Sequence, residues 1–203
     1  MRIHEMRVAP NPRRVRIFLA EKGVPMEYVQ VDLNSGEHLD EAFRKKNPMA
    51  KVPVLELDDG SYLSETMAIC RYFEELHPEP PLLGGSPLER AQIEMWQRQV
   101  EFFFFVPSGM CYQHTSGVFA KFRRTFPEWG EANRRGASRY FDFLNGHLAD
   151  RPFIAGETFS VADITALCTI DFNKRANQLF IQPEQTNLDR WYREVSSRPS
   201  ARA

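Results

Sequence analysis

The first 76 residues alternate between strand-like and helix-like patterns. Stretches in which every second residue is apolar predict strands, and stretches with apolar residues three or four positions apart predict helices. Strands are expected over residues 3–8, over 26–33 and as two runs within 52–64 joined by a turn at Asp59-Gly60, and helices over 12–23, 39–47 and 65–78. This β-α-β-α-β-β-α order predicts a small α/β domain.

A segment rich in proline and glycine, residues 77–87 (HPEPPLLGGSP), interrupts these patterns. Prolines and glycines at this density do not continue a helix or a central strand. We therefore expect a linker here, between one domain of residues 1–76 and a second of residues 88–203. Strand patterns almost vanish in the second domain, which is predicted to be all-helical. Its expected helices cover 88–112, 131–148, a segment starting at FSVADI (159–164), and 188–197.

The start of the FSVADI helix carries a capping signal. Ser160 and Asp163 stand three residues apart, as the two members of a capping box do, with Asp in place of the usual Glu. The sequence therefore predicts that this helix begins directly after Ser160.

Composition narrows the classes of function. The 203 residues are 42% hydrophobic and 26% charged, an ordinary globular balance, and the net charge of −1 provides no field that favours nucleic acid or an anionic membrane. Three widely spaced cysteines form neither a disulfide framework nor a metal or redox motif, which is typical of a reducing compartment. No apolar run approaches the roughly 20 residues that span a bilayer, and no signal-peptide pattern is present. We expect a cytoplasmic protein without metal, nucleic-acid or membrane partners.

Two short segments are suited to binding an amino-acid or peptide ligand. Pro53 enters a strand without an N–H for the ladder, and a cis bond before Pro53 would leave the backbone of Val52 free to pair with an extended ligand. At a strand-to-helix junction, Glu65 is placed to accept an ammonium group, while Thr66 and the helix N-terminus are placed to bind a carboxylate. Taken singly, each segment is better explained without a ligand, the first as a strand-entry proline and the second as ordinary helix capping.

Six segments, taken in order, resemble the successive motifs of soluble glutathione transferases, in particular the theta, zeta and related bacterial branches. They are APNPRRVRIFLAEKG, GEHL, NPMAKVPVL, LSETMAICRYFEE, the linker and FIAGETFSVADI. The resemblance covers essentially the whole chain. It implies a thioredoxin-like N-terminal domain that binds glutathione, a helical domain that forms the acceptor pocket, and a homodimer. The implied activity transfers the thiolate of glutathione, a co-substrate, to a small hydrophobic electrophile without a metal.

The resemblance also assigns residues to one part of glutathione. Val52, beside a cis-Pro53, matches the residue whose backbone pairs with the cysteine of glutathione. Glu65 and Thr66 match the acidic and hydroxyl pair that holds the γ-glutamyl end. The family commonly has Ser at the position of Thr66.

Two residues are candidates for binding the glycyl carboxylate of glutathione. His38, within GEHL, resembles a side chain that contacts this carboxylate in theta-like members. Lys51 is the second candidate. A solvated loop position explains His38 equally well.

The chain departs from the family where the reacting sulfur is expected. Family members usually place Ser, Tyr or Cys just before the first helix, and alignment on RRVR puts Ala9 there, which donates no side-chain hydrogen bond. Pro10 and Pro12 lack backbone N–H groups. Asn11, with a side-chain NH₂ and a backbone N–H, is therefore the expected catalytic donor to the thiolate. Asn11 also suits the simpler role of helix cap.

The acceptor pocket is expected between residues 9–12 and the helical domain. Four consecutive phenylalanines, residues 102–105, point around more than one helical face, so some must face a pocket, a dimer partner or solvent. Tyr112 and His114 are alternative sources of the polar group that Ala9 lacks. The predicted lining residues are Ala9, Pro10, Phe105, Met110, Tyr112 and His114.

Two other functions remain open from the sequence. Ala9 favours a non-catalytic glutathione-fold protein that binds ligands or regulates other proteins. A glutathione-dependent peroxidase, reductase or isomerase is the second alternative, in which Cys111 would take part in thiol exchange if it lines the pocket. The identity of the electrophile does not follow from the sequence.

Overall fold

The computed structural model describes residues 1–203, which form two compact units. The N-terminal unit comprises Met1–Leu82 together with Pro199–Ala203, and the helical unit comprises Leu83–Arg198. The division between them falls inside the expected linker. The last five residues, which the sequence pattern places in the helical domain, belong to the N-terminal unit instead.

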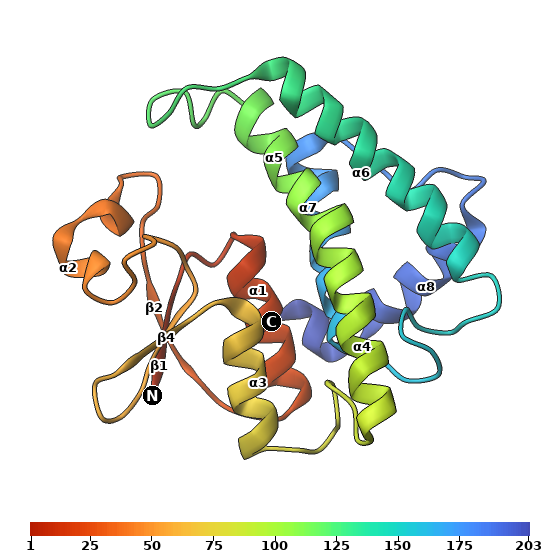
Figure 1. The fold of residues 1–203 in the computed structure, drawn as a ribbon, viewed down its shortest axis with the longest axis horizontal. Helices are drawn as coiled ribbons and strands as arrows, with labels where there is room; N and C mark the ends of the chain where they lie inside the picture. The colour runs from red at the N-terminus through yellow and green to blue at the C-terminus, as the bar shows by residue number, and fades with distance from the viewer. The chain divides into compact units, whose positions relative to one another are not determined.

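The N-terminal unit is a four-stranded mixed sheet covered by helices. Strand order is β2-β1-β3-β4, with β1 parallel to β2 and antiparallel to β3, and β3 antiparallel to β4. Figure 1 shows α1 and α3 on one side of this sheet and α2 on the other. The predicted β-α-β-α-β-β-α order and thioredoxin-like arrangement are confirmed. The elements are β1 (Arg2–Glu5), α1 (Pro10–Glu21), β2 (Glu27–Gln30), η1 (Glu37–Leu39), α2 (Glu41–Arg44), β3 (Val54–Glu56), β4 (Tyr62–Ser64), α3 (Thr66–Leu76) and η4 (Pro199–Arg202).

Two apolar groups stabilise this unit. Helices α1 and α3 bury one face each, with Val15, Phe18 and Phe73 fully inaccessible to solvent. Burial of each large apolar side chain contributes about 1.5–3 kcal/mol. A second cluster joins Val31, Phe43, Val52 and Val54, with Met6 and Leu33 packed against it. This second cluster holds the segment that leads into β3.

A buried ion pair fixes helix α1 against the sheet. The guanidinium of Arg16 pairs with the carboxylate of Glu5 at the end of β1, and it also donates to the carbonyl of Arg7 at 2.8 Å. Gln30 of β2 donates to the other oxygen of Glu5 at 3.0 Å. Because both charges are buried and hydrogen-bonded, α1 cannot slide along β1 without leaving a charge unpaired.

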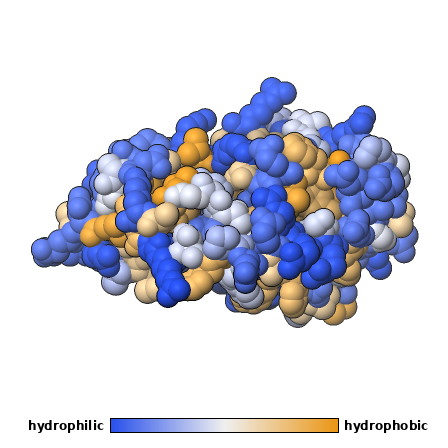
Figure 2. Space-filling model, turned by 90° about the horizontal axis from the view of Figure 1, so that it is seen from above, coloured by the Kyte–Doolittle hydropathy of each residue, from blue (hydrophilic) through white to orange (hydrophobic).

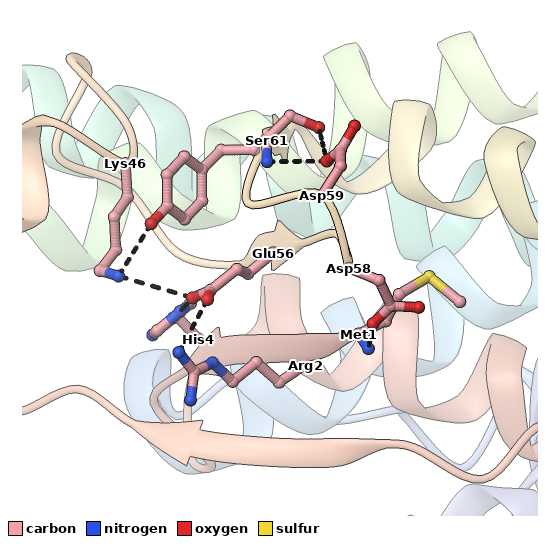
Figure 3. Close-up of polar contacts among 9 residues, drawn as sticks. Met1, Arg2, His4, Lys46, Glu56, Asp58, Asp59 and Ser61 are labelled. Carbon is pink, nitrogen blue, oxygen red and sulfur yellow. Dashed lines mark hydrogen bonds and ion pairs between the residues drawn. The ribbon is translucent and has the colours of Figure 1, made fainter.

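A second polar network lies on strands β1, β3 and β4 (Figure 3). Glu56 accepts hydrogen bonds from Arg2 and from the ring of His4, each at 2.7 Å, and Lys46 lies 3.5 Å away. Lys46 also donates to the hydroxyl of Tyr62. The hydrogen bonds from Arg2 and then His4 lower the pKa of Glu56 to about 2. The carboxylate therefore stays ionised at every ordinary pH.

The turn η4 at the C-terminal end of the chain lies against helix α1. Arg13 donates to the carbonyl of Ala201 at 3.0 Å, and the hydroxyl of Ser200 donates to Glu21 at the other end of the helix. These contacts join residues up to 188 positions apart in the sequence. They explain why residues 199–203 belong to the N-terminal unit.

The helical unit contains five α-helices and two π-helical segments, and its predicted all-helical class is confirmed. The single helix expected over residues 88–112 is interrupted by a π-helical turn that contains the four phenylalanines. Helix α7 is central, since every residue from Val161 to Ile170 is buried. The elements are α4 (Pro87–Val100), η2 (Glu101–Phe105), α5 (Val106–Thr115), α6 (Pro127–His147), α7 (Val161–Phe172), η3 (Asn173–Asn177) and α8 (Thr186–Ser197).

The capping box predicted at the start of α7 is confirmed. One carboxylate oxygen of Asp163 accepts the backbone N–H and the hydroxyl of Ser160, at 2.9 and 3.0 Å. The other accepts the backbone N–H of Ile154 at 2.9 Å and the indole N–H of Trp191 at 2.8 Å. Complete burial raises the pKa of Asp163, although all four donors oppose that shift. One side chain thus connects a loop, α7 and α8.

Helices α5 and α6 approach each other closely at a glycine. A Cβ placed on Gly130 would lie 2.5 Å from the methyl carbon of Thr115 and 3.0 Å from the Cβ of His114. Only glycine allows this approach without displacement of α5.

Candidate functional site

The pairing of the strands brings three predicted site segments to the same end of the sheet. Val54, the first residue of β3, pairs with His4 near the end of β1 and with Ser64, the last residue of β4. The segment after β1, the segment before β3 and the segment after β4 therefore emerge at the same end of the sheet. These are residues 6–11, 52–53 and 65–66.

The segment before β3 presents an unpaired backbone. The Val52-Pro53 peptide bond is cis, as expected. The backbone N–H and C=O of Val52 make no hydrogen bond within the protein, because the sheet ladder begins only at Val54. A buried backbone without partners is suited to pair with an extended peptide ligand.

A buried asparagine that sequence reasoning did not single out holds this segment. Asn47 is 2% exposed; its side-chain amide donates to the carbonyl of Lys51 at 2.9 Å, and its side-chain oxygen accepts the N–H of Met49 at 3.0 Å. Ala50 adopts a positive φ of 52° between them. The Asn-Pro dipeptide at 47–48 is a turn signal in the sequence, but it does not indicate this double hydrogen bond.

The start of α3 combines backbone strain with free donors. Glu65 precedes the helix with φ 72° and ψ 123°, and its side chain makes no capping hydrogen bond. A non-glycine residue in such a conformation costs about 1–3 kcal/mol, a strain that is concentrated at functional sites. The Glu65 carboxylate is exposed and forms no ion pair within the protein, while Thr66 is 5% exposed. An ammonium acceptor and helix N–H donors thus lie side by side.

Three basic side chains gather near the turn η1. Burial lowers the pKa of His38, and the positive charges of Lys51 and Arg44 lower that pKa further. The Nδ1 atom of His38 is buried without a hydrogen-bond partner. An anion placed here would gain charge-assisted hydrogen bonds. His38 and Lys51 are the two candidates that the sequence offered for an anion, and their role stays a prediction. Arg44, in the predicted helix of residues 39–47, was not among these candidates.

The N-terminus of α1 offers one backbone donor in its first turn. Ala9 is the N-cap residue, with no side-chain cap, and its own N–H is bonded to Met6. Since Pro10 and Pro12 have no N–H, only the N–H of Asn11 remains. The interpretation of Asn11 as the helix cap is therefore wrong, because Ala9 and not Asn11 holds the N-cap position.

The residues expected to line the acceptor pocket from the helical unit are all partly buried there. The ring of Tyr112 lies edge-on against those of Phe119 and Phe172. The Nδ1 atom of His114 accepts the N–H of Phe126 at 3.0 Å, so the neutral imidazole carries its proton on Nε2. The proposed role in the pocket stays a prediction for these two and for the remaining members, Phe105 and Met110.

The four consecutive phenylalanines have different environments, as expected. Phe104 is fully buried and stacks on Tyr140, whereas Phe102 and Phe103 are 55% and 62% exposed. Figure 2 shows that apolar residues reach the surface in separate patches on the face that it draws.

The third candidate chemistry, thiol exchange at Cys111, is opposed by its environment. Cys111 is fully buried, and this burial raises its pKa. Exchange requires the thiolate, which a raised pKa disfavours.

No helix has the length and apolar character that a membrane crossing demands.

Comparison with known proteins gives consistent matches over both units. The family model "Glutathione S-transferase, N-terminal domain" matches residues 3–81, and "Glutathione S-transferase, C-terminal domain" matches residues 112–199. Glutathione S-transferase 2 of Saccharomyces cerevisiae is 34% identical over all of this chain and 88% of its own. The crystal structure of Gtt2 from the same yeast has a TM-score of 0.94 and covers 100% of this chain and 99% of the other. A glutathione S-transferase domain-containing protein of Marinobacter aquaeolei has a TM-score of 0.94 at 39% identity, covering 98% and 99% of the two chains.

Proposed function

Because the chain belongs to the glutathione S-transferase family, we propose that it binds glutathione and transfers the glutathione thiolate to a small hydrophobic electrophile. The observation that carries this proposal is the edge of the N-terminal unit. There the unpaired backbone of Val52 lies at the same end of the sheet as the uncapped start of α3. A tripeptide with one zwitterionic end matches both features.

Each part of glutathione then has a partner of suitable chemistry. The cysteinyl backbone pairs with Val52 beside Pro53. Glu65 accepts the γ-glutamyl ammonium, and Thr66 with the helix N–H groups binds the adjoining carboxylate. The glycyl carboxylate binds among the basic side chains of His38, Lys51 and Arg44.

The reaction needs the glutathione sulfur as a thiolate. The sulfur loses its proton to solvent, attacks an electrophilic carbon and forms a C–S bond, while the leaving group departs with the electron pair. We propose that Asn11 donates the hydrogen bond that stabilises the thiolate. Its N–H and NH₂ lie at the positive end of the α1 dipole. Binding fixes the sulfur in place before attack, which lowers the entropic part of the barrier.

Isothermal titration calorimetry of the Glu65→Gln variant tests the binding site. Loss of one charge-assisted hydrogen bond costs about 1.5–3 kcal/mol, so we expect glutathione to bind about 10- to 150-fold more weakly. Glu75→Gln is the matched control, because Glu75 is an exposed acid in the last turn of the same helix. Equal affinity in wild type and Glu65→Gln would exclude this site, and no binding by the wild-type protein would exclude the function.

One observation favours a second candidate function, a glutathione-binding protein without transferase activity. Ala9 contributes no hydroxyl, and its N–H is already bonded to Met6. Measurement of the pKa of the bound glutathione sulfur, from the ultraviolet absorbance of the thiolate, separates the two functions. A transferase lowers this pKa below that of free glutathione, and a simple binder does not.

We also propose that the protein is a homodimer, as the family resemblance implies. The exposed side chains of Phe102 and Phe103 in η2 support this proposal, because large apolar groups in adjacent exposed positions favour burial against a partner. Light scattering of wild type and of a Phe102→Ser/Phe103→Ser variant gives the test. A monomeric wild type contradicts the proposal.

A further inference from the structure

The side chain of Asn11 has a fixed orientation in the first turn of α1. Its Oδ1 atom accepts a hydrogen bond from Nη1 of Arg14 at 3.1 Å. A guanidinium only donates, so the atom that faces it must be the carbonyl oxygen and not the NH₂. This contact settles the assignment of the two amide ends, which otherwise resemble each other closely.

The NH₂ group of Asn11 consequently points away from Arg14. It makes no hydrogen bond within the protein, and the residue is partly exposed. A donor that is fixed at one end and unpaired at the other is available to a ligand. Without Arg14, rotation about the terminal amide torsion would present the oxygen or the NH₂ with similar ease.

Arg14 is itself held firmly. Its side chain is 1% exposed although it carries a full charge. It lies three residues after Asn11, on the same face of the helix. Helix α1 is fixed in turn by the buried pair of Arg16 and Glu5. A buried guanidinium at this distance also polarises the amide, which strengthens its NH₂ as a donor.

We infer that Arg14 is a positioning residue that turns the NH₂ of Asn11 toward the glutathione sulfur. This inference rests on the proposed function, in which Asn11 donates to the thiolate. It explains how a chain with Ala9 at the usual hydroxyl position presents a side-chain donor in a defined direction. Arg14 itself need not touch glutathione.

The pKa of the bound glutathione sulfur is the appropriate readout, because a purely structural role would not change it selectively. We expect Asn11→Ala to raise this pKa by about one unit, equivalent to about 1.4 kcal/mol. Arg14→Met should raise it by a smaller amount, because the released amide still presents its NH₂ part of the time. The double variant should show no rise beyond that of Asn11→Ala, because Arg14 acts only through the Asn11 side chain. The affinity for S-methylglutathione, which has no ionisable thiol, should change less than threefold.

Arg13→Met is the matched control for the lost charge. Arg13 is the neighbouring residue in the same turn, and it donates to Ala201 rather than to Asn11. We expect the sulfur pKa to stay close to that of wild type. An equal rise in Arg13→Met and Arg14→Met would overturn the inference, since it would show a general effect of positive charge.

Two further variants keep the test valid if Arg14→Met does not fold. Arg14→Lys keeps the charge and a single donor, and we expect it to restore most of the low sulfur pKa. Asn11→Asp keeps an acceptor for Arg14 but removes the NH₂, and we expect the sulfur pKa to rise above that of wild type. An unchanged pKa in Asn11→Asp and Asn11→Ala would overturn both this inference and the assigned role of Asn11. Glutathione binding by the wild type would then still support the binding function.

Discussion

Replacement of Asp163 tests how much of the stability of the helical unit depends on one buried carboxylate. The four groups that donate to it come from Ser160, Ile154 and Trp191. Asp163→Ala leaves all four donors without an acceptor. Asp163→Asn keeps one oxygen and places an NH₂ against donors on the other side.

The expected magnitudes follow from these contacts. A buried donor without an acceptor costs about 1–3 kcal/mol. In Asp163→Asn the hydroxyl of Ser160 is able to rotate and accept from the new side-chain amide, which leaves one unsatisfied N–H, so we expect this variant to cost about 2–3 kcal/mol. For Asp163→Ala we expect about 4–6 kcal/mol, less than four full penalties because water enters the vacated volume. This is a large part of the roughly 5–15 kcal/mol of a typical protein.

Urea unfolding followed by circular dichroism and by tryptophan fluorescence gives both values. Ser160→Ala is the control, because it removes only the hydroxyl and should cost about 1 kcal/mol. Equal slopes against urea show that the compared states are the same. If Asp163→Ala lowers the free energy of unfolding by less than about 1 kcal/mol, the reasoning is refuted.

Three further predictions concern stability and binding. Glu56→Gln should lower the free energy of unfolding by about 1–2 kcal/mol at pH 7. Because the pKa of Glu56 in the folded protein is lowered to about 2, the difference between wild type and variant should shrink as the pH falls below the ordinary value of 4.5 and vanish near pH 2. A difference that stays constant with pH would contradict this. Gly130→Ala should cost about 1–3 kcal/mol through its contact with Thr115, and Thr115→Ser should restore part of this loss, because the Cβ of His114 remains close. Gly136→Ala in the same helix has open space and should stabilise by about 1 kcal/mol; equal unfolding free energies of the two glycine variants would contradict this. Lys51→Ala should weaken binding of glutathione but not of its glycine-amide analogue, as calorimetry will show.

The elements of the N-terminal unit follow from the sequence because their signals are local. The apolar spacing in α1, the Asp59-Gly60 turn and the strand-entry Pro53 each act within a few residues. The capping box at Ser160 is equally local. The resemblance to known motifs supplied what periodicity does not, namely which backbone and side-chain groups we propose to face the ligand.

Other features depend on contacts that no local pattern encodes. The π-helical turn within the predicted long helix contains one buried, one partly buried and two exposed phenylalanines. Helical periodicity alone does not indicate where a turn widens. The charges around His38 come from a neighbouring helix and from the segment before β3. The orientation of Asn11 depends on the buried side chain of Arg14, although both residues lie in one turn.

The contact of Arg13 with Ala201 affects how the N-terminal unit folds during translation. The N-terminal unit receives its last piece, residues 199–203, only after the entire helical unit has been synthesised. Domains that precede others in a chain generally fold first during translation. Here the leading unit emerges early but stays incomplete along α1 until the final turn has left the exit tunnel.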